Sequence, residues 1–386
     1  MNYLGHPQAD LESAGGIWTA REISQQPVAW TKIEGVMSRE AAALRAFLGP
    51  LLERRDLRIV LTGAGTSAFV GECLAPALKL RTSLRVDAVA TTDLVGSPDA
   101  WLERGVPTLF VSFARSGNSP ESMAAVALAE QGLSDCHHLI FTCNAAGGLY
   151  GEGKRLRNAH VVLLPEETND RGFAMTSSFS GMMLAACLTF DLLGNVRADA
   201  LSRWAAHVLE VGVAFTTSLA RWGFERVVYL GGQEFKGLAR EAALKMLELS
   251  DGKVVALAET PLGFRHGPKT IVNGKTLVVM FLSNDPYARR YEMDLLRELR
   301  SDGVAARVAV LDAGGTSEFG NGEGLAVAGA TDASNLSLCF PYVVFAQTFA
   351  FLQSLTLGLR PDTPNARGVV NRVVQGVSIY AWKPAR

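Results

Sequence analysis

The sequence contains none of the features that mark the more specialised classes of protein. Its 386 residues carry a formal net charge of −1, so there is no excess of positive charge to attract nucleic acid or an anionic membrane. Charged residues make up only 19% and hydrophobic residues 48%, a balance that excludes a disordered chain and predicts a compact globular protein. The partner is therefore expected to be a small molecule or another protein.

Cysteine pairs, a secretion signal and an uninterrupted apolar span are missing as well. The five cysteines are scattered without a CxxC spacing, which predicts small buried side chains in a reducing cytoplasm. The N-terminus has neither a basic start nor an apolar core, so it is no secretory signal. The longest apolar tract, 336–359, is interrupted by Pro341 and two glutamines, and we interpret it as a buried strand end followed by a core helix. These absences predict a cytoplasmic protein without a membrane span.

What the sequence does contain is a regular alternation of short apolar runs with amphipathic helical stretches. The runs are apolar on both faces, as expected for buried parallel strands, and the alternation is typical of an α/β fold. In the first half of the chain they are RIVLTGAG (58–65), TLFVSF (108–113), HLIFTC (138–143) and HVVLLP (160–165).

The same pattern returns in the second half of the chain at nearly constant spacing. RVVYLGGQ (226–233), TLVVMF (276–281) and VAVLDAG (308–314) follow the first three runs in the same order. We infer an internal duplication into two α/β halves, each a doubly wound parallel sheet flanked by helices. The predicted divisions are a helical segment at 1–44, a first domain at 45–196, a second domain at 215–358 and a tail at 359–386.

Two loops in the first half combine glycine with hydroxyl side chains where a strand runs into a helix. They are TGAGTSAF (62–69) and SFARSGNSPES (112–122). Ligands of doubly wound sheets bind beyond the carboxyl ends of the strands, where glycine allows close approach and helix N-termini suit an anion such as phosphate. The candidate phosphate-binding residues are Gly65, Thr66, Ser67, Arg115, Ser116, Gly117, Asn118 and Ser119.

Other interpretations of these loops stay open. The hydroxyl side chains of both loops are also good helix caps. Gly63, Gly65 and Ala68, with Asp87 about 20 residues further on, fit a dinucleotide-binding fingerprint. That match is weak by itself, and such a cofactor has no need of the second hydroxyl-rich loop. A nucleophilic serine is disfavoured because the chain has no G-x-S-x-G elbow.

The second half offers acid–base chemistry instead of phosphate binding. The segment 240–252 predicts a helix on which Lys245 and Glu248 share a face with leucines, and a carboxylate in such surroundings can serve as a base. Glu241 and Lys245 have the spacing of a simple surface ion pair. Further on, His266 stands before a Gly-Pro pair that ends local structure and holds it in a turn. No two histidines have the spacing of metal ligands, so no metal site is expected.

Seven segments give these residues a context along the whole chain. They are REISQQPVAW (21–30), GAGTS (63–67), RSGNS (115–119), ETNDRGFAMTSSF (167–179), EAALKMLE (241–248), HGP (266–268) and GVVNRVVQGVSIY (368–380). In order and spacing they resemble the sugar isomerase (SIS) domain family. Within it they are most similar to the AgaS-type galactosamine-6-phosphate deaminase/isomerases (tagatose-6-phosphate ketose/aldose isomerases) and to the isomerase half of glucosamine-6-phosphate synthase. The resemblance implies two tandem SIS domains of flavodoxin-like fold.

The resemblance also implies roles for single residues. The two loops would hold the phosphate of a sugar phosphate. Glu248 would move a proton between C1 and C2, His266 would catalyse ring opening, and Lys245 would set the charge near the phosphate or Glu248. No cofactor is required. In the synthase the histidine comes from the adjacent subunit, which implies a homodimer or a dimer of dimers with His266 contributed across the interface.

Several departures from the synthase pattern shape the expected function. Ala114, Arg115 and Ser116 replace its Ser-Gln-Ser, so the role of Arg115 is not settled. The lysine of the synthase tail has no counterpart that we carry over, and Asn371 and Arg372 are candidate tail contacts. The chain has no glutaminase domain to supply ammonia, so ammonia release is expected.

The expected reaction converts galactosamine 6-phosphate to tagatose 6-phosphate and ammonia. A glucosamine-6-phosphate deaminase that gives fructose 6-phosphate differs only at the C4 hydroxyl, and a ketose/aldose phosphate isomerase is a third variant. From another class, a regulator that binds a sugar phosphate without catalysis would keep the phosphate loops. Such a regulator usually adds a DNA-binding segment, and residues 1–44 carry few basic side chains.

Overall fold

A computed structural model describes residues 1–315, 323–374 and 376–383 of the chain. These residues form two compact units, each built around one five-stranded sheet. We call them the first-sheet unit (29–170, 177–192 and 369–386) and the second-sheet unit (1–28, 171–176 and 193–368).

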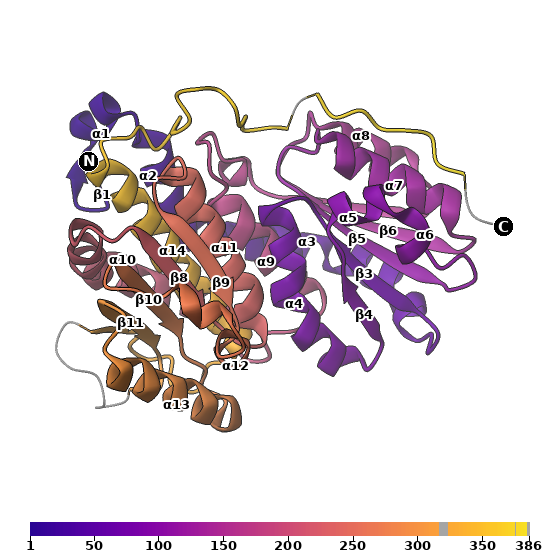
Figure 1. The fold of residues 1–386 in the computed structure, drawn as a ribbon. Coiled ribbons are helices and arrows are strands. Elements are labelled where there is room, and N and C mark those ends of the chain that lie inside the picture. Colours follow the sequence, from indigo (N-terminus) through magenta and orange to yellow (C-terminus); the bar gives the residue numbers. More distant parts are fainter. Residues whose placement is uncertain (316–322, 375, 384–386) are drawn as a thin grey trace. The chain divides into compact units, whose positions relative to one another are not determined.

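The first-sheet unit contains a parallel sheet with the strand order β4-β3-β5-β6-β7 (Figure 1). Its strands β3 and β5 are buried along their whole length, which explains why their sequences are apolar on both faces. The strands are β3 (Arg58–Thr62), β4 (Arg85–Ala88), β5 (Thr108–Ala114), β6 (Cys136–Thr142) and β7 (Ala159–Leu163). The helices are α3 (Gln26–Leu52), which begins in the other unit, α4 (Thr66–Thr82), α5 (Thr91–Gly96), α6 (Pro98–Trp101), α7 (Pro120–Gly132), α8 (Gly148–Arg155), α9 (Ser177–Thr189) and the short 3-10 helix η1 (Glu166–Thr168).

The second-sheet unit repeats this plan with the order β12-β11-β10-β8-β9, again with every neighbouring pair parallel. Its strands are β8 (Arg226–Leu230), β9 (Val255–Glu259), β10 (Thr276–Phe281), β11 (Arg307–Asp312) and β12 (Gly324–Ala326), and a two-residue hairpin, β1 (Asn2–Tyr3) and β2 (His6–Pro7), lies near the N-terminus. The helices are α1 (Gln8–Ala14), α2 (Ile17–Ser24), α10 (Ala198–Arg221), α11 (Glu234–Leu249), α12 (Pro261–Phe264), α13 (Pro286–Asp302), α14 (Asn335–Thr356) and the 3-10 helix η2 (Pro268–Ile271).

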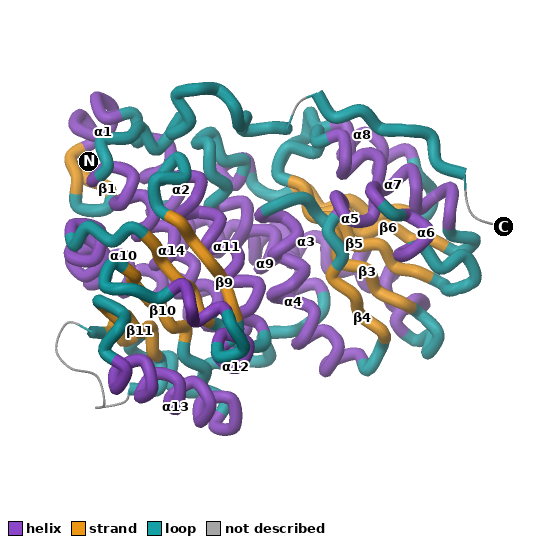
Figure 2. Tube along the Cα trace, viewed as in Figure 1, coloured by secondary structure: helices purple, strands orange, loops and turns teal. Residues whose placement is uncertain are grey.

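In both sheets the order in which strands are added switches from one side to the other at one point, as expected for a doubly wound fold. In the first sheet the chain leaves β3 toward β4 on one side and then crosses to β5 on the other, and in the second sheet β8 stands in the same position between β9 and β10. The strands of both sheets are drawn in orange in Figure 2. The predicted fold class, two α/β halves with parallel sheets flanked by helices, is confirmed.

The apolar tract near the C-terminus is a single helix, which corrects the prediction of a strand end followed by a helix. Helix α14 begins at Asn335 and continues through Pro341, and it is buried on all sides within the second-sheet unit. By length and composition alone α14 could cross a membrane, but its most apolar window is entirely buried inside the protein. A helix that is apolar all round is expected at such a buried position.

The C-terminal tail extends along the first-sheet unit. Trp382 packs against the core cluster that includes Phe110 and Leu133. Its ring Nε1 donates to the carboxylate of Asp99 at 3.1 Å, and its carbonyl accepts from the side chain of Gln131 at 2.9 Å. These contacts join the last described residues of the chain to α6 and α7.

All five cysteines are free thiols in buried positions, so the prediction that they are small core side chains is confirmed.

Candidate active site

The two predicted phosphate loops follow neighbouring strands of the first sheet. Strands β3 and β5 pair in parallel, with Thr62 opposite Ser112, so their carboxyl ends meet at the same edge. The first loop leads into α4, and the second leads into α7. The structure therefore brings the two loops together at the edge where doubly wound sheets bind their ligands.

The first loop turns sharply into α4 because of its glycines. Gly65 has φ +54° and ψ −124°, a conformation that favours glycine. A Cβ on Gly63 would lie 2.6 Å from backbone and side-chain atoms of Ser67, so this position also needs glycine. Thr66 and Ser67 occupy the first turn of α4, and both are buried. The N-terminus of a 17-residue helix thus stands at the loop, which is the arrangement that suits an anion.

The second loop is closed by hydrogen bonds of its own side chains. The Oγ of Ser116 accepts from the backbone N–H of Asn118 at 3.3 Å. Ser119 is the N-cap of α7, and its Oγ accepts from the N–H of Ser122 at 3.2 Å. Helix capping is therefore confirmed for Ser119. Capping and phosphate binding use the same geometry, because the cap leaves the remaining N–H groups of the first turn facing outward.

Two asparagines hold the second loop against the residues that lead into α8. The side chain of Asn144 donates to the carbonyl of Ser116 at 2.8 Å. The side-chain oxygen of Asn118 accepts from the N–H of Gly148 at 2.8 Å, and the carbonyl of Gly117 accepts from Leu149 N–H at 2.9 Å. The supporting role of Asn144 was not predictable from the sequence, because Asn144 lies 28 residues from its partner Ser116.

Arg115 is buried, with only 5% of its surface exposed. Its Nη2 donates to the carbonyl of Arg372 in the C-terminal tail at 2.9 Å. Arg372 in turn donates from its guanidinium to the backbone carbonyl of Asp170, whose side-chain carboxylate accepts from the N–H groups of Ser177 and Ser178 at the start of α9. In this conformation Arg115 therefore joins the second phosphate loop to the tail.

The predicted acid–base residues form a charged row on α11. The ammonium of Lys245 contacts the carboxylate of Glu248 one turn further on, and it lies 3.5 Å from the carboxylate of Glu241 one turn earlier. Lys245 and Glu241 have no exposed surface, whereas the side chain of Glu248 is 24% exposed. The interpretation of Glu241 and Lys245 as a surface pair is wrong, since both are fully buried.

The burial of this row limits which of its members can meet a substrate. Charges that are removed from water are stable only when they are paired, and here one ammonium stands between two carboxylates. Glu248 is the member whose carboxylate is open on one side, so it is the one that can take and return a proton. The burial of Glu241 is what sequence reasoning missed, because an i,i+4 acid–base pair has the same spacing on a surface and in a core.

His266 lies on an exposed turn between α12 and η2. Its backbone N–H donates to the carbonyl of Gly263 at 2.9 Å, and the turn continues through Gly267, whose φ is +123°. Within the part of the chain that the structure describes, the imidazole makes no hydrogen bond or ion pair. Flanking side chains anchor the turn: Arg265 and Lys269 both bind the carboxylate of Glu298 on α13.

Comparisons with known proteins show which family this chain belongs to. The SIS domain profile matches residues 51–191. A Streptomyces coelicolor relative is 48% identical over 369 residues, which cover 95% of this chain and 96% of its own length. The Escherichia coli protein named D-galactosamine-6-phosphate deaminase AgaS is 45% identical over 96% of this chain and 97% of its own. This chain belongs to the AgaS family of SIS-domain proteins.

A solved structure shows how far the likeness of this AgaS-family chain extends. The crystal structure of tagatose-6-phosphate ketose/aldose isomerase from Escherichia coli is 41% identical and superposes with a TM-score of 0.89, covering 99% of this chain and all of that one. The SIS profile itself covers only the first sheet and both phosphate loops. The full-length likeness thus includes α11 and the turn of His266.

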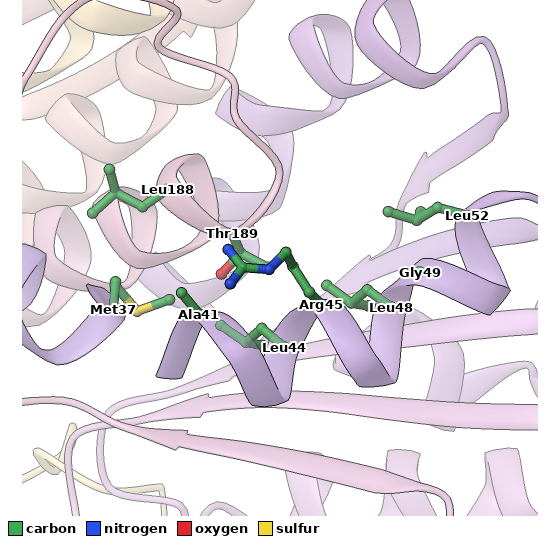
Figure 3. Close-up of a pocket in the computed structure, with 9 residues that line it drawn as sticks. All are labelled: Met37, Ala41, Leu44, Arg45, Leu48, Gly49, Leu52, Leu188 and Thr189. Carbon is green, nitrogen blue, oxygen red and sulfur yellow. The ribbon is translucent and has the colours of Figure 1, made fainter. Parts of the chain in front are cut away.

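A groove of about 470 Å³ runs along α3 in this AgaS-family chain, and none of the candidate site residues lines it (Figure 3). Its lining is mainly apolar and contains no carboxylate, histidine or cysteine. The lining residues are Met37, Ala41, Leu44, Arg45, Leu48, Gly49, Leu52, Leu188 and Thr189.

Proposed function

We propose that this protein is an amino-sugar-phosphate deaminase/isomerase that converts galactosamine 6-phosphate and water to tagatose 6-phosphate and ammonia. The observation that carries the proposal is the row on α11, where a partly exposed carboxylate is held by a buried lysine and a second buried carboxylate. Relatives that are 42–48% identical over almost the whole chain include proteins named D-galactosamine-6-phosphate deaminase AgaS, which supports this substrate.

The proposed reaction begins with ring opening and ends with loss of nitrogen. His266 transfers the proton that opens the ring, which gives the C1 aldehyde with an amine on C2. Glu248 removes the C2 proton, the bonding electrons form the C1=C2 double bond of an enolamine, and the C1 oxygen takes up a proton from solvent; the carboxylic acid of Glu248 then returns its proton to C1. The product is a C2 iminium with a C1 hydroxymethyl group. Water adds to C2, ammonia leaves, and the C2 ketone of tagatose 6-phosphate remains.

The substrate needs no cofactor in this scheme, because its own carbonyl and imine accept the electrons. The phosphate is proposed to bind the N-termini of α4 and α7, with hydroxyls from Thr66, Ser67, Ser116 and Ser119. Lys245 is proposed to hold Glu248 in the orientation that proton transfer requires. The free thiols favour a reducing compartment, so we place the reaction in the cytoplasm.

A second candidate is simple ketose/aldose isomerisation of a sugar phosphate. It is favoured by the likeness to the Escherichia coli tagatose-6-phosphate ketose/aldose isomerase, to which this chain is 41% identical. The same two residues would act, and the reaction would stop at the proton transfer. A glucosamine-6-phosphate deaminase is a variant of the first proposal with the other configuration at C4. A regulator that binds a sugar phosphate without catalysis would not need the charged row of Glu241, Lys245 and Glu248 on α11.

One assay separates these candidates. Purified protein is incubated with galactosamine 6-phosphate or glucosamine 6-phosphate, and ammonia and ketose phosphate are measured. Ammonia from the first sugar supports the main proposal, and ammonia from the second alone moves the substrate to the gluco series. A third incubation uses an aldose 6-phosphate without nitrogen; ketose phosphate from it, with no ammonia from either amino sugar, would support the isomerase instead.

The Glu248→Gln variant tests the role of the carboxylate itself. Turnover should fall by at least about a hundredfold, the scale of general acid–base catalysis, because glutamine cannot exchange a proton with C2. Binding of the sugar phosphate should persist. Leu247 is exposed on the same helix, so Leu247→Ala serves as the matched control and should keep its activity. Full turnover in Glu248→Gln would remove this residue from the mechanism.

A further inference from the structure

A cluster of three side chains with metal-binding chemistry lies in the first-sheet unit, apart from the phosphate loops. Cys136 and His138 are on β6, and Glu130 is on α7. Residues two apart on a strand point to the same side of the sheet, so β6 presents a thiol and an imidazole together. Cys136 is the first residue of β6, whereas the phosphate loops follow the carboxyl ends of their strands.

The three side chains are already close to one another. His138 Nε2 lies 2.8 Å from Glu130 Oε1 and 3.3 Å from Cys136 Sγ. All three candidate ligand atoms lie within 4.8 Å of one another. His138 is fully buried, Cys136 is 8% exposed, and the Glu130 side chain is 35% exposed. The cluster therefore has a buried floor and one side that is open to solvent.

These separations are near those of a tetrahedral zinc site. With Zn–S of about 2.3 Å and Zn–N and Zn–O of about 2.0–2.2 Å, a tetrahedral ion places sulfur about 3.6 Å and oxygen about 3.4 Å from the ring nitrogen. To admit the ion, the sulfur–nitrogen distance must grow by about 0.3 Å and the oxygen–nitrogen distance by about 0.6 Å. Glu130 is the most exposed member of the cluster, so its side chain can move outward by this amount.

The ring of His138 presents one nitrogen to the other two side chains. Nε2 faces the thiol of Cys136 and the carboxylate of Glu130, whereas Nδ1, the nitrogen that would not bind the ion, is buried and has no hydrogen-bond partner within the described chain. Contact with Phe110, whose ring centroid is 5.7 Å away at 67°, fixes the plane of the imidazole and keeps Nε2 directed at the thiol and the carboxylate.

A fourth residue supports the carboxylate as an outer partner. Asn158 donates from Nδ2 to Glu130 Oε1 at 2.8 Å and to the carbonyl of Cys136 at 2.7 Å. Such outer hydrogen bonds orient ligands in known metal centres. Asn158 thereby connects two of the three candidate ligands.

We propose that Cys136, His138 and Glu130 form a binding site for Zn²⁺. A sulfur, a nitrogen and an oxygen donor suit this ion and do not suit Mg²⁺ or Ca²⁺, which prefer oxygen ligands alone. Three protein ligands leave a fourth position for water on the open side. Binding releases the thiol proton to solvent. The ion joins the last turn of α7 to β6 and so stabilises the first-sheet unit.

The test uses full-length protein without an affinity tag, freed of metal by a chelator. Equilibrium dialysis against ZnCl₂ should show one Zn²⁺ bound per chain, and the melting temperature should rise as Zn²⁺ is added. Co²⁺ as a probe should produce the near-ultraviolet charge-transfer band of a cobalt thiolate. Absence of stoichiometric Zn²⁺ from the wild-type protein would overturn the proposal.

Variants identify the ligands. Glu130→Gln, at an exposed position that does not threaten folding, should weaken Zn²⁺ binding by at least about tenfold, the scale seen when a metal site loses a supporting group. Cys136→Ala should abolish the cobalt–thiolate band. Cys187→Ala, which removes an equally buried thiol in the same unit, should change neither measurement. Equal Zn²⁺ affinity in Glu130→Gln and wild type would show that the ion binds elsewhere and would also refute the assignment.

Discussion

Single residues in this protein differ in function according to their burial and not according to their type. Glu241, Lys245 and Glu248 follow one another on the same helix, yet only the last is open to solvent. A spacing of three or four residues says that side chains are neighbours, but it does not say whether water reaches them. The identity of the row was therefore predictable from the sequence, and the burial of Glu241 was not.

Removal of Lys245 should lower the free energy of unfolding, because the buried carboxylate of Glu241 loses its ion pair. Lys245→Met leaves the fully buried Glu241 without the ammonium beside it, and the free energy of unfolding should fall by about 3–5 kcal/mol. Urea unfolding measures the change. The double variant Lys245→Met with Glu241→Gln should regain much of the loss, because the one carboxylate that remains, Glu248, is partly exposed to water. A double variant that is no more stable than Lys245→Met would contradict this account.

Glu292 on α13 is predicted to make stability depend on pH. The residue is 3% exposed, its carboxylate accepts from the N–H of Ser283 at 2.8 Å, and burial raises its pKa to about 7. Its folded pKa thus lies above the unfolded value of 4.5. Between these two pH values the folded state keeps a proton that the unfolded state loses, so stability falls as pH rises and is lowest above about pH 7.

The Glu292→Gln variant should remove this pH dependence. Glutamine can accept the same hydrogen bond without a charge, so the loss of about 3 kcal/mol expected between pH 4.5 and 7 should largely disappear. Thermal unfolding at a series of pH values measures the slope for wild type and variant. Asp294→Asn, at an exposed position on the same helix, is the control and should keep the wild-type slope. Identical slopes in wild type and Glu292→Gln would rule out this carboxyl as the cause.

Helices and strands were predictable where the hydrophobic periodicity and the flanking turn residues indicate the same element. The buried strands β3, β5, β8 and β10 stand at their predicted places because an apolar run flanked by turn residues has few alternatives. Helix α14 was misjudged because a helix buried on every side has no amphipathic period. Pro341, which interrupts the apolar run in the sequence, lies inside the helix in the structure. Composition alone cannot tell such a helix from a strand.

At the start of α7, one serine is predicted to have two roles that substitutions can separate. Ser119→Ala removes the cap and should cost about 1 kcal/mol of stability. Ser119→Asn keeps a good cap but removes the hydroxyl, so it should retain stability. Both variants should bind a sugar phosphate more weakly than wild type, as measured by titration calorimetry.

The control for this pair lies in the other unit. Ser334 caps α14 in the same way, by accepting from the N–H of Ser337 at 3.2 Å. Ser334→Ala should lose similar stability and keep its affinity for the sugar phosphate. Wild-type affinity in Ser119→Asn would show that Ser119 acts only as a helix cap.

On the scale of the whole molecule, the sequence predicts two α/β halves, but it does not say which chain completes a given site. The recurrence of strand patterns is local information, and each sheet can be predicted from it. The source of a histidine on an exposed turn depends on assembly, which no local pattern encodes. His266, whose imidazole contacts no other described residue by hydrogen bond or ion pair, is the residue for which this matters most.

We propose that the protein forms a homodimer in which His266 serves the Glu248 of the neighbouring chain, and co-expression of two inactive variants tests this. In a mixed dimer of Glu248→Gln and His266→Asn, one site then combines an intact Glu248 with an intact His266, while the other site lacks both. Because random pairing makes half of the dimers mixed, about one quarter of wild-type turnover should return. If Glu248 and His266 act within one chain, every site contains one substituted residue and no turnover returns. The two variants purified separately and assayed alone provide the baseline, and sedimentation of the wild type as an active monomer would also refute the shared site.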